Sequence, residues 1–298
     1  MGSNIVHLLV NKGHTVTVLD DFSSGYHVNL DPFPQVQLIQ GSICDSLVVD
    51  RAVEGVEVIF HLAASVGNTR SIQYPIEDTE INALGTLRIL ETARHAGVRK
   101  VIYSSSAGIF GELKTLPIRE DHPIDPGSPY GASKLAGEKL CLAYSKLYDL
   151  EAVCLRYFNV YGINQRYDAY GNVIPIFAHH IFNRKPITIF GDGEQTRDFI
   201  NVRDVAQANY LAAQTYGVSG AFNLGSATRV TINWLATTMV EISGMKTPIE
   251  YAPPRPGDVR DSLADISAVQ QAVHFTPKVG LKEGLEEYMA WARKEMAA

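Results

Sequence analysis

The chain has 298 residues, of which 46% are apolar and 19% charged, and a formal net charge of −6 at pH 7. This length suffices for one large globular domain or two closely joined ones, and the acidic balance argues against a surface for nucleic acid or an anionic membrane. No uninterrupted apolar run approaches membrane-spanning length, and the three cysteines form no Cys-x-x-Cys pair, which indicates reduced thiols in a cytoplasmic protein without a metal site.

The first predicted elements are an amphipathic helix over residues 2–10 and a buried strand over residues 15–20, which ends on Asp20. A dinucleotide-binding unit normally has a further strand and a glycine-rich turn before its first helix. The sequence given shows neither, so we expect roughly ten residues to be missing before its start. Without them the strands on either side would lack hydrogen-bond partners and the pyrophosphate would lack its cradle, so we expect weak dinucleotide binding and lower stability than in an extended chain.

Strands and helices then alternate along most of the chain. Predicted strands cover residues 36–41, 56–64, 101–106, 151–156 and 220–224, and predicted helices cover residues 46–54, 77–96, 130–147, a segment from 202 onward, and 281–296. This alternation predicts an α/β fold with a doubly wound parallel sheet, right-handed crossovers and ligands at the carboxyl ends of the strands. After Gly162 the rhythm breaks into a loop-rich region, which predicts a second, smaller unit.

Residues 101–138 carry the clearest chemical pattern. A short apolar strand ends in three serines, and a helical pattern begins near Tyr130. Tyr130 and Lys134 are one helical turn apart, so they lie on one face of that helix. An ammonium beside a phenol favours the phenolate, and a serine hydroxyl can hydrogen-bond the oxygen that loses its proton. The pattern predicts removal of a proton from an alcohol, although a Tyr–Lys pair at this spacing also occurs by chance on helices that catalyse nothing.

The run Tyr-Gly-Ala-Ser-Lys after a serine-ended strand resembles the Ser-Tyr-Lys site of the extended short-chain dehydrogenases/reductases, specifically the nucleotide-sugar epimerases. The resemblance extends over essentially the whole chain. It implies that Ser106, Tyr130 and Lys134 are catalytic, and that Ser104 and Ser105 are structural. It also implies a Rossmann domain of residues 1–160 and 196–225, interleaved with a smaller nucleotide-sugar domain of residues 161–195 and 226–298.

The cofactor that the resemblance implies is NAD. Asp20, at the end of its strand, is placed to accept hydrogen bonds from the adenosine ribose, which favours NAD over NADP. Family members often have Asp where this chain has Ser42, so one adenine contact differs here, and we interpret His61 as structural. By resemblance Asn82 supports the turn after strand 56–64 and the active-site strand. The expected cofactor-binding residues are Gly2, Asp20, Asp21, Ser23, Ser24, Gly25, Ser42, Ile43, Leu62, Ala63, Ala64, Asn82, Ser104, Tyr130, Lys134 and Tyr157.

The implied substrate is a UDP-sugar. Arg197 in Thr-Arg-Asp-Phe and Arg255 in Arg-Pro-Gly-Asp match family positions that hold the substrate pyrophosphate, and guanidinium groups pair bidentately with phosphate oxygens. Either arginine taken alone reads more simply as an ordinary surface residue. The expected substrate-binding residues are Ser106, Tyr130, Asn159, Asn172, Val173, Thr188, Phe190, Arg197, Arg255, Asp258 and Ser262.

The activity that the resemblance implies is NAD-dependent 4-epimerisation of a UDP-sugar. Tyr130 removes the proton of the sugar 4-hydroxyl while C4 gives a hydride to NAD⁺, and the 4-keto sugar then turns over and takes the hydride back on its other face. Related 4,6-dehydratases and decarboxylases carry a further acid just after the catalytic Ser or Thr, where this chain has Ala107 and Gly108. A second alternative is a protein that binds nucleotide sugar and does no chemistry because its NAD site is incomplete.

Two finer expectations also come from the resemblance. The position of Ser262 lies beside the C2 substituent of the sugar, where a small residue admits N-acetylated sugars, so we predict interconversion of UDP-GlcNAc and UDP-GalNAc, with UDP-Glc and UDP-Gal as a second pair. The alternative is that Ser262 is an exposed strand residue whose size is irrelevant. The helices at 77–96 and from 130 pack against their copies in a homodimer in the family, although such faces could equally cover only their own core.

Overall fold

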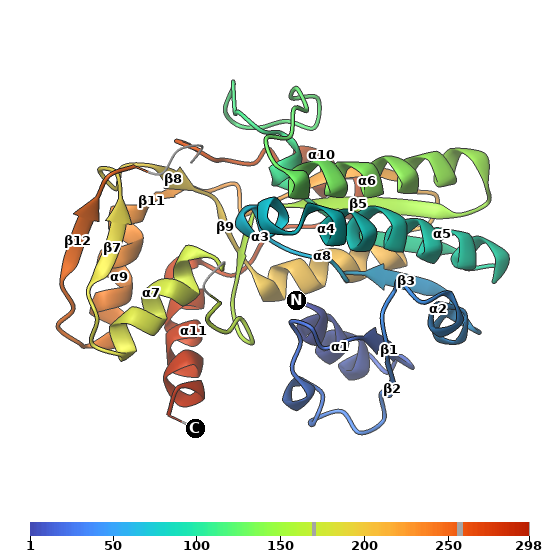
Figure 1. Cartoon of the computed structure of the whole chain (residues 1–298), viewed down its shortest axis with the longest axis horizontal. Helices are drawn as coiled ribbons and strands as arrows, with labels where there is room; N and C mark the ends of the chain where they lie inside the picture. Colours follow the sequence, from blue (N-terminus) through green and yellow to red (C-terminus); the bar gives the residue numbers. More distant parts are fainter. Residues whose placement is uncertain (169–170, 255–258, 298) are drawn as a thin grey trace.

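The computed structural model describes residues 1–168, 171–254 and 259–297. It consists of a larger lobe built around a parallel sheet and a smaller lobe beside it, which Figure 1 shows on the right and on the left. Arg255 and Asp258, two of the residues expected to bind substrate, lie outside the described residues. None of the helices in the described ranges is both long and apolar enough to cross a membrane.

The sheet of the larger lobe has four strands in the order β10-β5-β4-β3, with every pair parallel. Its strands are β3 (Val58–His61), β4 (Lys100–Ser106), β5 (Glu151–Tyr157) and β10 (Gly220–Leu224). Neighbouring strands of this sheet follow one another in chain order and run parallel, so each connection must be a crossover, and the predicted α/β fold with a parallel sheet is confirmed. The register places Ser106 opposite Tyr157 at the carboxyl edge of the sheet.

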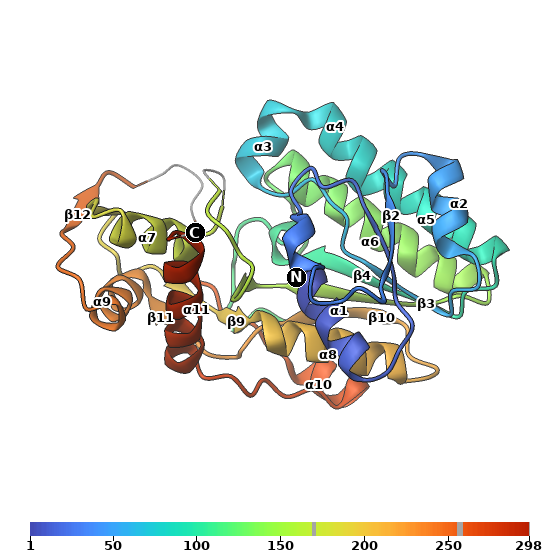
Figure 2. The ribbon, with the colours of Figure 1, turned by 90° about the horizontal axis from the view of Figure 1, so that it is seen from below.

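Helices cover both faces of this sheet, as Figure 2 shows. One face carries α2 (Ser46–Val53), α5 (Thr86–His95) and α6 (Pro129–Leu147), and the other carries α8 (Val202–Gln214) and α10 (Ser267–Val273), with α1 (Gly2–Asn11) packed on α8. Apolar side chains on the two faces form separate buried clusters around Val153 and Leu155 on one side and Val101 and Cys154 on the other. Because both faces of the sheet are covered, successive side chains of β4 and β5 are buried on one face or the other, which explains why these strands read as continuous apolar runs.

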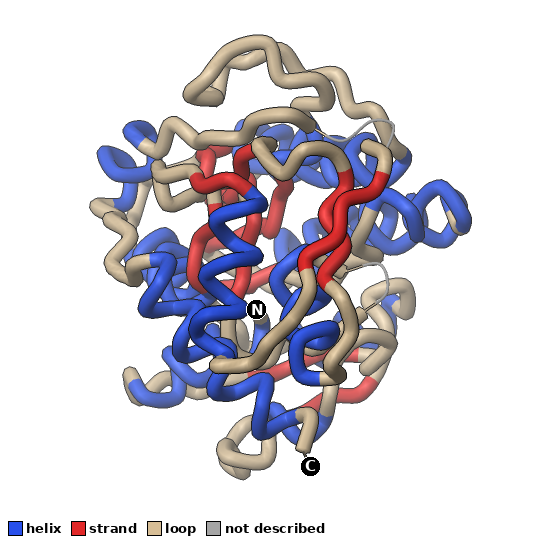
Figure 3. The backbone as a smooth tube through the Cα atoms, turned by 90° about the vertical axis from the view of Figure 1, so that its left-hand side faces the viewer, coloured by secondary structure: helices blue, strands red, loops and turns tan. Residues whose placement is uncertain are grey.

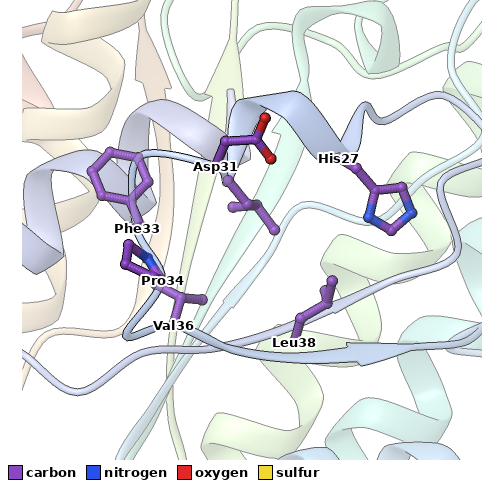
Figure 4. A pocket seen from close by; sticks show the side chains of 7 residues that line it. His27, Asp31, Phe33, Pro34, Val36 and Leu38 are labelled. Atoms are coloured by element: carbon purple, nitrogen blue, oxygen red, sulfur yellow. The ribbon is translucent and has the colours of Figure 1, made fainter.

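The β1 (Thr17–Asp20) and β2 (Gln37–Gln40) strands form a separate parallel pair. They share no ladder with β3 in the described structure. The connection between them contains the short helix η1 (His27–Asn29) and encloses a cavity of about 320 Å³ (Figure 4). Its walls are mostly apolar, with Leu30, Phe33 and Leu38 among them, so this cavity belongs to the loop and lies apart from the carboxyl ends of β4 and β5.

The helix predicted over residues 77–96 is not one regular α-helix. It consists of α4 (Pro75–Thr79), a π-helical segment η2 (Glu80–Gly85) and α5, and the shorter α3 (Asn68–Gln73) precedes it. Single π segments often occur at functional sites, and this one contains Asn82. A Cβ at Gly85 would lie 2.6 Å from Cδ1 of Ile43, so the glycine allows the helix to approach the turn after β2. Gly97 ends α5 with a positive φ of 70°, as expected of a glycine C-cap.

The smaller lobe contains short strand pairs and three helices. The strand pairs are β7 (Ile187–Phe190) with β12 (Ile249–Ala252), β8 (Thr196–Arg197) with β11 (Val230–Thr231), and β6 (Asn159–Tyr161) with β9 (Phe199–Asn201). The helices are α7 (Val173–Phe182), α9 (Ile232–Ser243) and α11 (Leu281–Glu295), and Figure 3 views the molecule from this side. Their apolar faces share one buried cluster that includes Phe177, Leu235 and Met289, so the segments before and after β10 in the chain form one core.

Candidate active site

The carboxyl end of β4 delivers three serine side chains with different surroundings. Ser104 and Ser105 are buried, and the Ser105 hydroxyl donates to Oε2 of Glu138 at 2.7 Å. Ser106 begins the short helix η3 (Ala107–Ile109), where its Oγ accepts a hydrogen bond from the Gly108 N–H at 3.0 Å. Ser106 is thus the most accessible of the three, which agrees with its predicted place in the site.

The first turn of α6 is fixed against η3. Ser128 caps the helix by accepting from the Gly131 N–H at 3.2 Å, and Pro129 occupies the first helical position. A Cβ at Gly131 would lie 2.6 Å from the Gly108 carbonyl oxygen, so only glycine permits this close approach. A Cβ at Gly108 would lie 3.3 Å from Ser106 Oγ and 3.7 Å from Cε1 of Tyr130, so the hydroxyl and the ring flank the same small space. The structure therefore brings Ser106 and Tyr130 together.

Lys134 lies one turn further along α6 and is 2% exposed. Its Nζ is 4.5 Å from the centre of the Tyr103 ring, and no hydrogen-bond acceptor for it is found among the described residues. Burial lowers the pKa of Lys134 to about 8, against the opposing influence of Cys141, Asp78 and Cys154. A buried ammonium with free donors suits a ligand oxygen, such as a ribose hydroxyl.

The protonation of Tyr130 differs from the simple expectation. Burial raises the pKa of Tyr130, a hydrogen bond with Ser106 lowers it, and the charge of Asp78 raises it further. Lys134 is not among the resolved causes, so the expectation that the neighbouring ammonium lowers this pKa is not met in the protein alone. The reason is that loss of hydration outweighs the attraction of a lysine that is itself poorly hydrated.

A buried polar network supports the Tyr130 turn from the side of α4 and η2. Asn82 accepts from the Ser65 N–H and donates to the Ser65 carbonyl, both at 2.9 Å, and also donates to Ser133 Oγ at 3.0 Å. Asn82 therefore joins the turn after β3 to α6, and its contact is with this helix and not with the active-site strand. His61 is neutral, since burial lowers its pKa to about 3, and it pairs with Thr86 at 2.9 Å, which fits a structural role.

Sequence reasoning missed a buried ion pair behind the serines. The carboxylate of Glu138 accepts bidentate hydrogen bonds from Arg156 at 2.8 and 3.0 Å, and both side chains are almost fully buried. Glu138 stands one turn after Lys134 on the same face of α6, so its spacing was a usable signal. Sequence reasoning also missed Asp78, which is fully buried and lies one helical turn before Asn82.

Many of the residues expected around the cofactor follow the carboxyl ends of β1, β2 and β3. Oδ1 of Asp20 accepts from the Phe22 N–H at 2.8 Å, and a Cβ at Gly25 would lie 3.1 Å from that oxygen, so the chain closes tightly around this carboxylate. Asp21, Ser23 and Ser24 are exposed, Ser42 accepts from the Cys44 N–H, Ile43 is buried, and Gly2 opens α1. Leu62, Ala63 and Ala64 form a half-exposed turn, whereas the Tyr157 hydroxyl is turned into the core against Asn209 at 3.0 Å.

These residues fit NAD. Lys134 in α6 offers free Nζ donors beside Tyr103 of β4, and Asp20 at the carboxyl end of β1 offers acceptor oxygens, which are the groups that the ribose hydroxyls of a dinucleotide need. When bound, NAD supplies a hydride acceptor and donor at the sugar carbon. The described residues contain no group of three or more His, Cys, Asp or Glu side chains arranged to hold a metal ion.

Apart from Ser106 and Tyr130, the described residues expected to bind substrate belong to segments of the smaller lobe and to residues 259–264. Asn159 in β6 donates to the Asp198 carbonyl at 2.9 Å, Asn172 and Val173 open α7, and Thr188 and Phe190 lie half-buried on β7. Arg197 in β8 donates to its neighbour's carbonyl at 2.8 Å, so its guanidinium is held near the chain segment of residues 259–264. Ser262 in that segment is 7% exposed and outside any strand, so the alternative of an exposed strand residue is wrong.

A serine–tyrosine–lysine set at the carboxyl edge of a parallel sheet defines an oxidoreductase-type site of the short-chain dehydrogenase/reductase class. The chain belongs to the NAD dependent epimerase/dehydratase family, whose model matches residues 1–225.

Among its relatives, the UDP-glucose 4-epimerase of Mycolicibacterium smegmatis is 36% identical over 99% of this chain and 96% of its own length. The solved UDP-glucose 4-epimerase of Thermotoga maritima with UDP-glucose is 36% identical, with a TM-score of 0.94 over 99% of this chain and 96% of that one. The UDP-N-acetylglucosamine 4-epimerase of Methanobrevibacter ruminantium, in complex with UDP-N-acetylmuramic acid, is 33% identical, with a TM-score of 0.94 over 99% and 95%. The agreement in family and fold covers both lobes.

Proposed function

We propose that this enzyme interconverts UDP-GlcNAc and UDP-GalNAc, with UDP-Glc and UDP-Gal as a second substrate pair. At the coarser level it is an NAD-dependent UDP-sugar 4-epimerase, as its family, its nearly full-length relatives and its Ser-Tyr-Lys site indicate together. The assignment of the individual catalytic and binding residues, and the choice of N-acetylated sugar, are the proposed parts.

Tyr130 is the base in this proposal. Its phenolate takes the proton of the sugar 4-hydroxyl and later returns a proton to that oxygen on the inverted carbon. Ser106 orients the same oxygen, because its Oγ and the Tyr130 ring flank one small space beside Gly108. Lys134 holds its charge beside this space and uses its free donors to orient the cofactor ribose. The remaining step, rotation of the 4-keto sugar, needs a pocket that binds the UDP group firmly and the sugar loosely.

The choice of N-acetylated sugar rests on one observation, the fixed position of a small side chain at Ser262. The chain around it is tied to β8 by the Thr196 N–H, which donates to the Arg260 carbonyl at 3.0 Å, and to Asp198, which accepts from the Ala264 N–H at 3.1 Å. Ser262 therefore cannot swing away from the residue pair Thr196–Arg197. A seryl side chain held there leaves space that a larger residue would fill.

The dehydratase and decarboxylase alternatives are disfavoured by the residues after Ser106. These reactions need a further acid near C5 or C6 of the sugar, and η3 presents Ala107 and Gly108 at that place. The alternative of a non-catalytic binder is disfavoured by the buried Lys134, because a charge held in a dry site with free donors is costly unless it acts on a ligand.

The test is incubation of the purified chain with UDP-GlcNAc or UDP-Glc, with and without added NAD⁺, and quantification of the C4 epimers. The proposal expects both sugars to be epimerised and the rate to depend on NAD⁺ content. Epimerisation of UDP-Glc alone would overturn the N-acetyl assignment. Loss of water or carbon dioxide from the sugar would overturn the epimerase assignment, and tight binding without any product would favour the non-catalytic alternative.

We further infer a homodimer formed through the faces of α4, η2 and α6. Ile76, Leu84 and Leu147 on these elements are 75%, 47% and 72% exposed, which leaves large apolar side chains uncovered on neighbouring helices. Light scattering should give twice the chain mass, and Leu147→Arg should give monomers. Leu47→Arg on α2, at a similarly exposed apolar residue, is the matched control and should leave the dimer intact. A monomeric parent protein would contradict the inference.

A further inference from the structure

Asp78 in α4 has a fully buried side chain near Tyr130, and sequence reasoning did not identify it. Its Oδ2 accepts from the Ser133 hydroxyl at 2.5 Å, and its Oδ1 lies 3.2 Å from the Asn82 amide nitrogen, which shares its two hydrogens among this oxygen, the Ser65 carbonyl and Ser133 Oγ. Both carboxyl oxygens act as acceptors, which is the pattern of an ionised carboxylate. No lysine, arginine or histidine forms an ion pair with it within the described ranges of the chain, so it is a buried negative charge held by neutral donors.

The direction of the Ser133 hydroxyl ties this charge to the catalytic turn. Ser133 Oγ lies within hydrogen-bond range of two acceptors, Asp78 Oδ2 at 2.5 Å and the Tyr130 carbonyl at 3.1 Å, but it has one proton. The shorter, charge-assisted bond takes that proton. Ser133 immediately precedes Lys134, so the carboxylate is attached through one side chain to the turn that carries both Tyr130 and Lys134.

Among the groups around Tyr130 and Lys134, Asp78 is the one negative charge without an ion-pair partner in the described residues. Lys134 faces Tyr103 from β4, His61 from β3, Cys154 from β5 and Cys141 from its own helix. Of these, His61 is neutral because burial lowers its pKa, and the Tyr103 phenol and the Cys154 thiol are uncharged at neutral pH because burial raises the pKa of each.

Around Tyr130 the facing groups are the Ser106 hydroxyl and Asp78. Glu138, the next carboxylate along α6, is neutralised by Arg156. A negative charge without a counter-charge opposes ionisation of a neighbouring phenol, and it stabilises a neighbouring ammonium.

We propose that Asp78 is a positioning residue whose negative charge keeps the proton on Tyr130 and on Lys134 until substrate and cofactor bind. The charge stabilises the ammonium that the buried Lys134 would otherwise lose, and it opposes the phenolate in the empty site. The base is then released by the positive charge of a bound cofactor, so proton removal is coupled to a filled site. This inference rests on the proposed role of Tyr130 as the base.

The test is Asp78→Asn, which keeps the shape of the side chain and removes its charge; its amide nitrogen can donate to Ser133 Oγ, whose own proton then goes to the Tyr130 carbonyl. In the protein without cofactor, the titration of Tyr130 is followed by tyrosinate absorbance, as the difference between each variant and the same variant carrying Tyr130→Phe. The titration should move to lower pH by about one unit. Both limbs of the kcat/KM pH profile should move the same way, because Tyr130 and Lys134 both lose a proton more easily. Ser133→Ala removes the hydroxyl link and keeps the charge, so it should leave the Tyr130 titration within a few tenths of a unit.

A purely structural role of Asp78 predicts different results. Asp78→Asn would then lower kcat, as Ser133→Ala would, with an unmoved tyrosinate titration, and this outcome overturns the inference. If Asp78→Asn does not fold, Asp78→Ser removes the same charge with a smaller polar side chain and carries the same expectation. Undiminished epimerisation by Tyr130→Phe would instead contradict the proposed function, so the two failures are distinguishable.

Discussion

The catalytic corner, formed by the end of β4, the α4–η2 segment and the first turns of α6, and the substrate wall, formed by β7, β8 and residues 259–264, hold their charges in opposite ways. In the corner Lys134 and Asp78 are buried and joined to the chain by short hydrogen bonds or ring contacts. In the wall the Arg260–Asp192 pair exposes more than half of each side chain. An exposed pair contributes little stability and opens readily for an anionic ligand, whereas a buried charge shifts protonation. In the proposed function the corner therefore sets the chemistry, and the wall recognises the substrate.

The comparison is tested most strongly at Glu138, the buried carboxylate behind the serines. Glu138→Gln should lower the free energy of unfolding by about 3–5 kcal/mol, because it leaves Arg156 buried without its counter-charge. Denaturant unfolding measures this change. The matched control is Glu57→Gln, which breaks the exposed pair with Arg99 and should cost less than about 1 kcal/mol. Similar losses in both variants would mean that burial does not separate the two kinds of charge.

Lys134→Met should stabilise the protein while abolishing its turnover. The folded pKa of about 8 is below the unfolded value, so at pH 7 the folded state carries an ammonium that burial disfavours. Removing it should raise the free energy of unfolding by about 3 kcal/mol below pH 8. Between pH 8 and the unfolded pKa of about 10.4 the folded lysine is already neutral, so the gain should shrink to zero across this range. A gain that does not depend on pH would point to packing alone.

Tyr130→Phe should lower kcat at least about 100-fold, the usual effect of losing a positioned general base, while UDP-sugar binding stays intact. Ser106→Ala should have a smaller effect, because it removes one hydrogen bond to the same oxygen. Product formation gives the rates, and calorimetry gives the affinities. If Tyr130→Phe turns over at the parent rate, the corner does not contain the base.

Ser262→Tyr tests the wall. The ring should lower kcat/KM for UDP-GlcNAc by about 10- to 100-fold, since overfilling a formed pocket costs about 1–3 kcal/mol, and it should spare UDP-Glc. Ser262→Ala keeps the space and should leave both substrates unchanged. A Tyr variant that still accepts UDP-GlcNAc would show that this residue does not limit the sugar.

The sequence predicted the corner better than the wall for a physical reason. Tyr130 and Lys134 are one helical turn apart, and Ser106 ends a strand that reads as a continuous apolar run, so local periodicity was enough to relate them. The segments that carry Arg197 and Ser262 are joined by contacts such as the Thr196–Asp261 hydrogen bond, between residues 65 positions apart, which no local pattern encodes.

The π-helical segment was also missed, because an extra residue in a helical turn leaves an apolar pattern nearly unchanged. The raised pKa of Tyr130 could not be foreseen, since it depends on burial in the folded chain and on the charge of Asp78, which is distant in sequence.

The central claim is that one buried base acts on the 4-hydroxyl while the hydride stays within the site. The most direct measurement uses UDP-GlcNAc labelled with deuterium at C4 and follows the label by mass spectrometry and NMR after complete equilibration in ordinary water. The account predicts that the label remains at C4 in both epimers and that none is lost to the solvent. Washout of the label would mean that C4 is deprotonated by a side chain, and this result would contradict the account.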